Sequence, residues 1–450
     1  MRLLPIAGFL QLLPLLRGVK AELRSSKDPQ IPSKYPIGHV DEPFAKPAGR
    51  VFEVNGTVKY MTGTNAWYLN RLDEEDLEIT LKQIIDASSF PSLFLPLFLI
   101  FAGKGRPCNR KAGPVKLSGY ELIRVWAFGE INELPNPKAS EPAPMSVFFH
   151  YLNETGGYIN YGPEGLDRFD RLVSRCEDLG LKLVLPLFNQ WSDYGGAPLY
   201  ISTYSDTWTE RWIEFPKAQE VYRDYVKVIV ERYKDSPAVF SWQLGNEPRC
   251  EGCDNLEKLV DWARNVSAYI KELDPEHMVS MGDEGWLTPR EREQGYGDKG
   301  TGYNGNNGVD WVSIMGIETL DYGTVHLWPD HWAYPYEWGV QWIEDHDKLA
   351  AQFNKPIILE EYGAAKRDGH IEPLLPWQDA LLNSGFAADQ TWQFEPDGTS
   401  FTNFPDPQFA IHYGSEEWSV LAKNHSLRVD AKTKALQLGS SEVSEIRIHH

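Results

Sequence analysis

Short apolar runs recur along the chain, separated by stretches in which apolar residues follow a helical spacing. A run such as Val239–Leu244, which Gly245 ends, predicts a short buried strand. Between the runs, the stretch Leu166–Leu179 has helical periodicity, and Gly180 is typical of a helix end. Strands are predicted at Met61–Asn65, Leu122–Trp126, Leu183–Phe188, Val239–Leu244, Met278–Met281, Thr324–Leu327, Pro356–Glu361 and Gln390–Phe394. Eight strands alternating with helices predict the α/β class and a (β/α)8 TIM barrel, whose chemistry lies at the C-terminal strand ends.

Two of these strands end in acidic residues. One is followed by Asn246-Glu247-Pro248, where Pro248 forbids further ladder pairing and leaves Glu247 at the strand end. The other ends in Glu360-Glu361-Tyr362-Gly363. Each could be an ordinary polar strand end, but two strand-end carboxylates are what a retaining glycosidase needs. One protonates the leaving oxygen while the other, about 5–5.5 Å away, attacks the anomeric carbon.

The motifs Asn246-Glu247-Pro248 and Glu361-Tyr362-Gly363 together resemble glycoside hydrolase family 5, and within it the secreted endo-β-1,4-mannanases of fungi and plants. The resemblance covers residues from about 50 to about 394, which is one domain. It implies that Glu247 is the acid/base and Glu361 the nucleophile. Glu360 is the competing nucleophile, but side chains alternate along a strand, so both acids cannot face one cleft.

The resemblance also implies a sugar site at the other strand ends. Arg124 matches the arginine that holds the nucleophile ionised, since a nearby cation lowers the pKa of a carboxylate. Asn246 matches the asparagine that binds the 2-hydroxyl, and Trp392 the floor under the reacting sugar. Further substrate-binding residues are implied at Asn65, Trp191, Arg249, Glu284 and His326. Outside this context, Arg124 and Glu284 would be interpreted as salt-bridge residues and Trp392 as a core residue.

Position 328 departs from the family pattern. Trp328 stands where tyrosine is usual, within the segment that carries His326. The change removes a hydroxyl that could bond the nucleophile, although an indole N–H could replace it as a donor.

The composition restricts the kinds of molecule that the protein is expected to bind. The chain carries 64 acidic and 44 basic residues, with a net charge of −20, which argues against nucleic acid or an anionic membrane. A neutral β-mannan polysaccharide meets no such objection, and the chain has 16 tryptophans, a residue type that stacks on sugars. No stretch after the N-terminal segment is long enough to span a bilayer. No residue cluster has metal-ligand spacing, so neither metal nor cofactor is expected, and the chain is expected to act as a monomer.

The two ends of the chain lie outside the predicted barrel. Residues 1–21 combine a basic start with an apolar run and are predicted to be a signal peptide, so the protein is expected to be secreted. Four Asn-X-Ser/Thr sequons permit glycosylation. Residues 22–50 are predicted to be an extended arm, 51–426 the catalytic barrel and 427–450 a C-terminal tail. A hairpin signal at Asn55-Gly56 is similar to the hairpin that covers the barrel bottom in similar mannanases.

Two cysteines follow the acid/base strand as Cys250-Glu251-Gly252-Cys253. This spacing occurs in redox pairs and in half zinc sites, but the chain has no second CxxC and no thioredoxin-like context. In similar mannanases this loop carries a local disulfide, so the resemblance implies a bond between Cys250 and Cys253. Cys176 lies on an apolar helix face and is predicted to be a buried thiol.

Residues 89–118 interrupt the link between a helix predicted at Asp73–Ala87 and the strand at Leu122–Trp126. The first half of this stretch is rich in Ser, Phe, Pro and Leu, and its prolines exclude a regular helix. These residues are largely pyrimidine-coded, as a translated intron tract would give. The hypothesis is a retained intron or a gene-prediction error, and a genuine loop is the alternative. Cys108 lies inside the stretch.

Together these features predict a secreted retaining endo-β-1,4-mannanase that hydrolyses internal bonds of mannan, galactomannan or glucomannan by double displacement. A β-mannosidase or a transglycosylase on the same scaffold is the alternative enzyme. A cellulase agrees less well with Asp283-Glu284-Gly285 and Asn246-Glu247-Pro248-Arg249. A carbohydrate-binding protein without turnover would result if the insertion disrupts the site.

Overall fold

The computed structural model describes residues 22–86, 120–135, 147–205, 211–366, 369–401 and 406–448, with side chains as far as residue 439. The predicted signal peptide (1–21) and the predicted insertion (89–118), with Cys108, lie outside the described residues.

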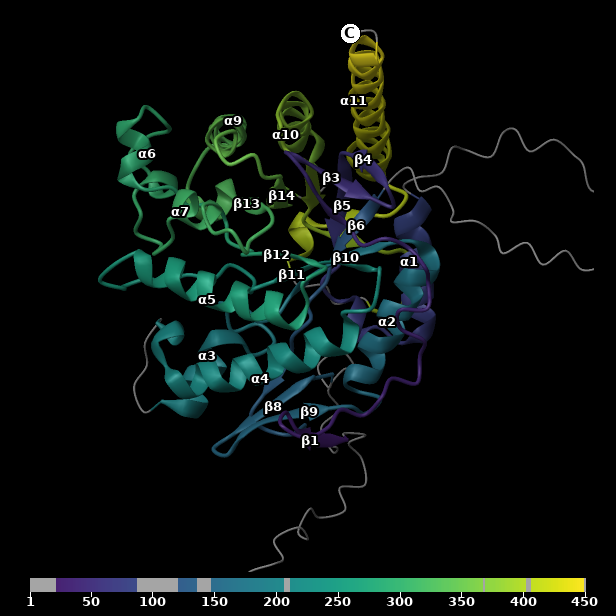
Figure 1. The fold of residues 1–450 in the computed structure, drawn as a ribbon, viewed down its shortest axis with the longest axis vertical. Coiled ribbons are helices and arrows are strands. Elements are labelled where there is room, and N and C mark those ends of the chain that lie inside the picture. Colours follow the sequence, from purple (N-terminus) through teal and green to yellow (C-terminus); the bar gives the residue numbers. More distant parts are fainter. Residues whose placement is uncertain are drawn as a thin grey trace, which may run out of the picture.

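Eight parallel strands form the centre of the molecule (Figure 1). They are β5 (Met61–Asn65), β6 (Tyr120–Arg124), β10 (Lys182–Pro186), β11 (Val239–Gln243), β12 (Met278–Ser280), β13 (Gly323–Leu327), β14 (Ile357–Tyr362) and β15 (Ala388–Thr391). Their hydrogen-bonded order is β12-β11-β10-β6-β5-β15-β14-β13. Between β12 and β13, backbone bonds from Asp321 N to Val279 O (2.8 Å) and from His326 N to Glu284 O (3.0 Å) close the circle. The predicted (β/α)8 barrel is confirmed.

Helices surround the strands and connect them (Figure 1). The longer ones are α1 (Glu74–Asp86), α2 (Leu166–Leu179), α4 (Pro216–Tyr233), α5 (Glu257–Leu273), α9 (Trp338–Ala350) and α10 (Ile371–Asn383). The shorter ones are α3 (Gly196–Tyr204), α6 (Pro289–Glu293), α7 (Trp311–Met315) and α8 (Pro329–Trp332), with 3₁₀ turns η1 (Leu69–Arg71), η3 (Trp212–Glu214), η4 (Thr301–Tyr303) and η5 (Pro407–Phe409). In α2 the periodic apolar side chains are buried, Cys176 among them as a free thiol, and Gly180 ends the helix at φ 70°. The sequence predicted all three features.

A small antiparallel sheet closes the bottom of the barrel. It consists of β2 (Lys46–Ala48), β3 (Val51–Val54) and β4 (Thr57–Lys59), with Asn55 and Gly56 at positive φ in the turn. Phe52 is fully buried and packs on Phe240 and Tyr322, with ring centroids 4.9 and 5.5 Å away. The predicted hairpin and its position under the barrel are confirmed.

The residues predicted to form an arm, 22–50, contribute to two sheets. At one end β2 pairs with β3 under the barrel. At the other end β1 (Leu23–Ser25) pairs with β9 (Gly156–Asn160) in a sheet completed by β8 (His150–Asn153) and β7 (Glu130–Ile131). The arm is therefore held to the barrel at both ends.

The C-terminal segment, predicted as a tail beyond the catalytic barrel, is helical. After the short strands β16 (Phe394–Glu395) and β17 (Ile411–His412), the π-helical stretch η6 (Trp418–Asn424) continues into α11 (His425–Ile448). Thr433 Oγ1 accepts from Tyr60 N (3.0 Å), and Lys432 Nζ lies 4.0 Å from the centre of the Tyr60 ring. Helix α11 thus packs beside β4 and β5 before it extends away from the barrel (Figure 1). Within the described ranges, no helix combines the length and the apolar character needed to cross a membrane.

Candidate active site

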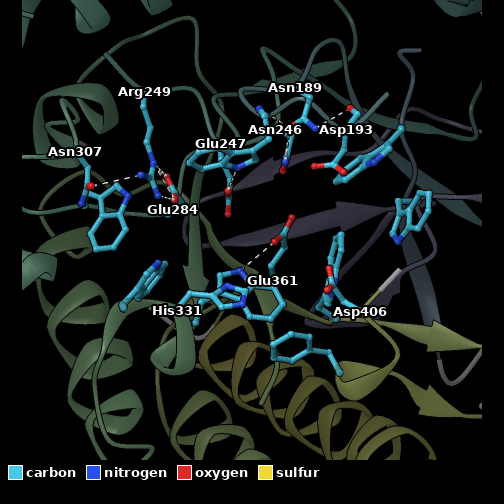
Figure 2. A pocket seen from close by; sticks show the side chains of 18 of the residues that line it. Asn189, Asp193, Asn246, Glu247, Arg249, Glu284, Asn307, His331, Glu361 and Asp406 are labelled. Carbon is cyan, nitrogen blue, oxygen red and sulfur yellow. Dashed lines mark hydrogen bonds and ion pairs between the residues drawn. The ribbon is translucent and has the colours of Figure 1, made fainter. Parts of the chain in front are cut away.

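A cleft of about 680 Å³ opens at the C-terminal ends of the barrel strands. Glu247 and Glu361 lie at its centre with their carboxylates facing each other (Figure 2). One carboxylate oxygen of each acid and a ring nitrogen of His326 all lie within 4.8 Å of one another. This separation fits a retaining pair, for which about 5–5.5 Å is usual. It is too short for an inverting pair, which needs roughly 6.5–9.5 Å to accommodate a water.

The chain after β11 turns sharply to display Glu247. A Cβ at Gly245 would lie 2.1 Å from a ring carbon of Phe188, so only glycine permits this close approach. Asn246 N then donates to Phe188 O (2.7 Å), and Glu247 N donates to Gly282 O (2.8 Å). Glu247 itself has φ 52°, an uncommon conformation for a residue with a side chain. The neighbouring strand ends therefore fix the backbone that carries this acid.

Glu361, on β14, receives hydrogen bonds at both carboxylate oxygens. Arg124 Nη1 donates to Oε1, and Trp328 Nε1 donates to Oε2 at 3.2 Å. The indole N–H thus occupies the position for which the sequence predicted a replacement donor. Arg124 is fully buried, and its other nitrogens donate to Gln243 (2.9 Å) and to Asn246 (2.8 Å). These bonds hold the guanidinium against Glu361.

Glu360 lies below the cleft and does not line it. Gln243 Nε2 is 2.8 Å from each of its carboxylate oxygens, and Arg124 Nε is 3.4 Å from Oε2. The pairing register of β14 shifts between Leu359 and Tyr362. This irregularity interrupts the strict alternation of side chains between the two faces of the strand. Glu360 therefore reaches the barrel interior, while its neighbour Glu361 reaches the cleft.

The two cleft acids differ in pKa, in the opposite order to the one expected from their predicted roles. Burial would raise the pKa of Glu247, but the hydrogen bond and charge of His326, with the charge of Arg249, lower it to about 2. Burial raises the pKa of Glu361, against the charges of His326 and Arg124. His326 Nδ1 determines this order, because it lies 2.8 Å from Glu247 and 3.4 Å from Glu361.

The surroundings of the buried His326 favour its protonated form. Burial would lower its pKa, but the charge of Glu361, the hydrogen bond to Glu247 and the nearby carboxylate of Glu360 raise it to about 10. No metal-ligand spacing is visible in the sequence, yet the fold brings Glu247, His326 and Glu361 close enough to reach one cation. A protonated imidazole has no lone pair to offer, and both carboxylates already accept hydrogen bonds. The trio is therefore better suited to sharing protons than to binding a metal.

Aromatic side chains surround the acids. Trp191 is 40% exposed, and its Nε1 donates to Glu247 Oε2. Trp392 forms part of the floor, at 5.9 Å from the rings of both Trp126 and Trp328. These apolar faces suit the apolar faces of sugar rings.

One side of the cleft carries an ion pair between Arg249 and Glu284. Arg249 Nε donates to Glu284 at 3.2 Å, and the same guanidinium lies 4.8 Å from the centre of the Trp191 ring and 5.4 Å from that of Trp286. Asn307 approaches Arg249 Nη1 at 3.4 Å. Figure 2 shows this polar group to one side of the two acids.

Comparisons with known proteins agree with this geometry. Residues 116–378 match the family described as GH family 5 beta-mannosidase-like. The chain belongs to glycoside hydrolase family 5. It is 35% identical over 391 residues to the probable mannan endo-1,4-beta-mannosidase F of Aspergillus flavus, covering 86% of this chain and 74% of that protein. It is 34% identical to the mannan endo-1,4-beta-mannosidase A of Hypocrea jecorina, covering 85% and 77%.

Solved structures give the same result for the fold. The endo-1,4-beta-mannanase from Rhizomucor miehei superimposes with a TM-score of 0.69 at 25% identity, covering 87% of this chain and 99% of that one. A hyperthermostable endo-1,4-beta-D-mannanase from Thermotoga petrophila gives 0.65 at 26% identity, covering 82% and 99%.

Most of the predicted site residues of this family 5 hydrolase line the cleft, but Arg124, Asn65 and His326 do not. Asn65 is fully buried, and its amide donates to the backbone oxygens of Glu360 (2.9 Å) and Thr391 (3.3 Å). His326 is fully buried beneath the two acids. A direct sugar contact, as predicted for both Asn65 and His326, is not available in this geometry, because both side chains are fully buried and neither lines the cleft.

Several lining residues of the family 5 hydrolase were missed from the sequence. They are Trp67, Trp126, Asn189, Asp193, Tyr194, Trp286, Thr301, Asn307, His331, Trp332, Ala333, Asp406 and Phe409. Asn189 follows a predicted strand directly and Trp67 lies two residues after another, a position that could have identified them. His331, which carried no signal in the sequence, lies in the cleft with its ring 5.4 Å from Trp328.

The loop after β11 of the family 5 hydrolase is closed by a disulfide. Cys250 and Cys253 are bonded, with their Cα atoms 5.5 Å apart, as the sequence predicted. Arg249 lies immediately before this loop. The disulfide therefore restrains the segment that carries a cleft residue.

Proposed function

We propose that this family 5 hydrolase is a secreted, monomeric, retaining endo-β-1,4-mannanase. The observation that carries the proposal is the pair of opposed carboxylates within 4.8 Å of each other at the centre of a cleft. Relatives that share most of the chain are named as mannan endo-1,4-beta-mannosidases, which indicates the substrate class. The apolar run at residues 1–21 supports secretion.

In the first half of the reaction, a carboxylate oxygen of Glu361 attacks the anomeric carbon and forms a covalent glycosyl ester. The bond to the glycosidic oxygen breaks, and Glu247 gives its proton to that oxygen. Arg124 and Trp328 donate hydrogen bonds to Glu361 and orient it toward the sugar. In the second half, Glu247 takes a proton from a water that attacks the same carbon and releases Glu361.

Glu247 has to be protonated when the substrate arrives, although His326 favours its charged form. Glu247 and Glu361 are buried and close together, so their two negative charges would repel each other. The pair therefore favours holding one proton between them. A shift of the His326 hydrogen bond from Glu247 to Glu361 would place that proton on Glu247. Trp191 also donates a hydrogen bond to Glu247. A sugar bound beside this ring would replace the indole N–H as the partner of that carboxyl oxygen.

The cleft favours internal cleavage over removal of terminal sugars. The aromatic residues of the cleft include two ring pairs, Trp67 with Tyr194 (centroids 5.3 Å apart) and Trp286 with Trp332 (4.3 Å apart), which could hold successive sugars. Binding on both sides of the scissile bond is what an endo-enzyme needs. The β-mannosidase alternative would need one end of the cleft blocked.

Product analysis tests the proposal. The purified protein is incubated with linear mannan, galactomannan and a soluble cellulose derivative, with the Glu361→Ala variant as the control. We expect mannobiose and mannotriose from both mannans, and little release from cellulose. Mannose as the sole early product would favour a β-mannosidase, and faster cleavage of cellulose would reject both.

A further inference from the structure

Glu360 is a buried acid that the reaction described above does not use. Its side chain is fully buried and lies outside the cleft lining. Burying a carboxylate is costly unless cations and hydrogen-bond donors compensate for the lost water. Glu360 has such partners in Gln243, Arg124 and His326. These partners belong to the same network as the two cleft acids.

The ring of His326 faces a carboxylate at each of its nitrogens. Nδ1 lies 2.8 Å from Glu247 Oε1, and Nε2 lies 3.6 Å from Glu360 Oε2. A neutral imidazole carries only one N–H, so one of its nitrogens would direct a lone pair at a carboxylate. Acidic groups on both sides therefore favour the doubly protonated ring.

The balance of charges among Glu360, Glu361, Arg124 and His326 also favours the doubly protonated His326 ring. Arg124 is the cation nearest to both Glu360 and Glu361, at 3.4 Å from Glu360, and it cannot neutralise two acids. A charged His326 supplies the second positive charge. Asp283 and Glu284, which follow β12, also interact electrostatically with His326, and their ionised forms act in the same direction, although burial raises the pKa of each to about 7.

We propose that Glu360 is a positioning residue whose permanent charge keeps His326 an imidazolium between Glu247 and Glu361 and holds Arg124 against Glu361. The proposal rests on the proposed function for the roles of the two cleft acids. Glu361 loses its charge when it forms the glycosyl ester, and Glu247 gains and loses a proton. Glu360 has no access to the sugar and keeps its charge throughout, so both cations remain in place while the cleft acids change.

The test uses Glu360→Gln, which keeps the shape of the side chain and removes the charge. The full protein is labelled with ¹⁵N-histidine, and His326→Gln assigns the His326 signals. In the wild type we expect both ring nitrogens of His326 to be protonated at neutral pH. In E360Q the ring should become neutral at a pH lower by roughly 1–3 units. The alkaline limb of the kcat/KM profile on mannan should move in the same direction, and kcat/KM at neutral pH should fall roughly 100-fold.

Two further variants separate the effect of the charge at position 360 from effects on the folded structure. Glu360→Asp retains the charge and should keep the imidazolium even if activity falls. Asp389→Asn removes the charge of another buried acid, on β15, whose partners are Tyr362 and His425, and should leave the His326 signals unchanged. If E360Q does not fold, a neutral His326 ring in the wild type or in E360D would still overturn the proposal.

A neutral His326 in the wild type at neutral pH would overturn the proposal. An unchanged His326 titration in E360Q would also overturn it, as would a neutral ring in E360D. The spectra do not depend on turnover. An imidazolium in a protein that does not cleave mannan would therefore reject the proposed function while supporting the role of Glu360.

Discussion

At the residue scale, Glu361 is held by two groups that can only donate hydrogen bonds. The guanidinium of Arg124 and the indole of Trp328 each bond one carboxylate oxygen, and neither has a lone pair for a protonated carboxyl group. They therefore favour the charged form of Glu361 against its burial, which raises the pKa. This competition keeps the acid close to the state that a nucleophile needs.

The roles of the two acids can be separated by their variants. Glu247→Ala and Glu361→Ala should each abolish cleavage of mannan, because protonation and attack are both needed for a poor leaving group. On an aryl β-mannoside, whose leaving group needs no proton, added azide should restore turnover to E247A and not to E361A. The measurement is release of the aryl alcohol with and without azide. Loss of activity in Glu360→Gln with retention in Glu361→Gln would instead make Glu360 the nucleophile.

The chemistry of individual residues could be predicted only in part. The donor function of Trp328 followed from its N–H group, and the structure places that group on Glu361. The pKa order of the acids depends on which of them His326 bonds, and a linear sequence does not contain that distance. Asn65 was predicted to contact sugar because it ends a strand, but the direction of its side chain depends on the barrel interior.

At the element scale, the loop that carries Trp191 and Tyr194 is anchored on β7. Glu130 N donates to Tyr194 O (2.8 Å), and Glu130 Oε2 accepts from Gly196 N (3.1 Å). Among the described residues, its other oxygen has no hydrogen-bond partner. Burial raises the pKa of Glu130 from 4.5 to about 8. Burial therefore favours the neutral form of this carboxyl group at pH 7.

This pKa predicts how stability depends on pH. Between pH of about 4.5 and about 8 the unfolded state releases the Glu130 proton and the folded state keeps it, so the free energy of unfolding falls as pH rises. Glu130→Gln keeps an acceptor for Gly196 and removes this dependence. It should be more stable than the wild type at pH 8, by on the order of 3 kcal/mol, and similar near pH 4. Denaturant unfolding at both pH values checks this, and an equal difference at both would contradict it.

The flanks of the predicted insertion lie at the end of the barrel opposite the site. Helix α1 ends at Asp86, and β6 begins at Tyr120, whereas Arg124 lies at the other end of that strand. Both described flanks of the insertion therefore lie away from the cleft. The presence of the insertion is compatible with an intact arrangement of Arg124 and Glu361.

If residues 89–118 are a translated intron, deleting them should raise the soluble yield and preserve or improve mannanase activity, since a short helix–strand link is usual. Yield and activity are measured for the full chain and the deletion variant in parallel. Transcript sequencing across the region is an independent check. Reads that retain the segment in the dominant spliced message would contradict the intron hypothesis.

At the scale of the whole molecule, the sequence predicted the barrel and its two acids because both depend on local patterns. Each apolar run forms a strand, and the C-terminal ends of all the strands of a barrel lie on the same side. The walls of the cleft come from loops, whose paths depend on packing between distant segments. The C-terminal helix was missed because it leaves the barrel pattern and packs on Tyr60.

The central claim is that two opposed carboxylates hydrolyse β-mannan with retention of configuration. The most direct measurement is ¹H NMR of the anomeric signals while linear mannan is cleaved, recorded before mutarotation equalises the anomers. Double displacement through Glu361 predicts that the new reducing ends appear first as the β-anomer, with the α-anomer growing later. The α-anomer as the first product would contradict the account.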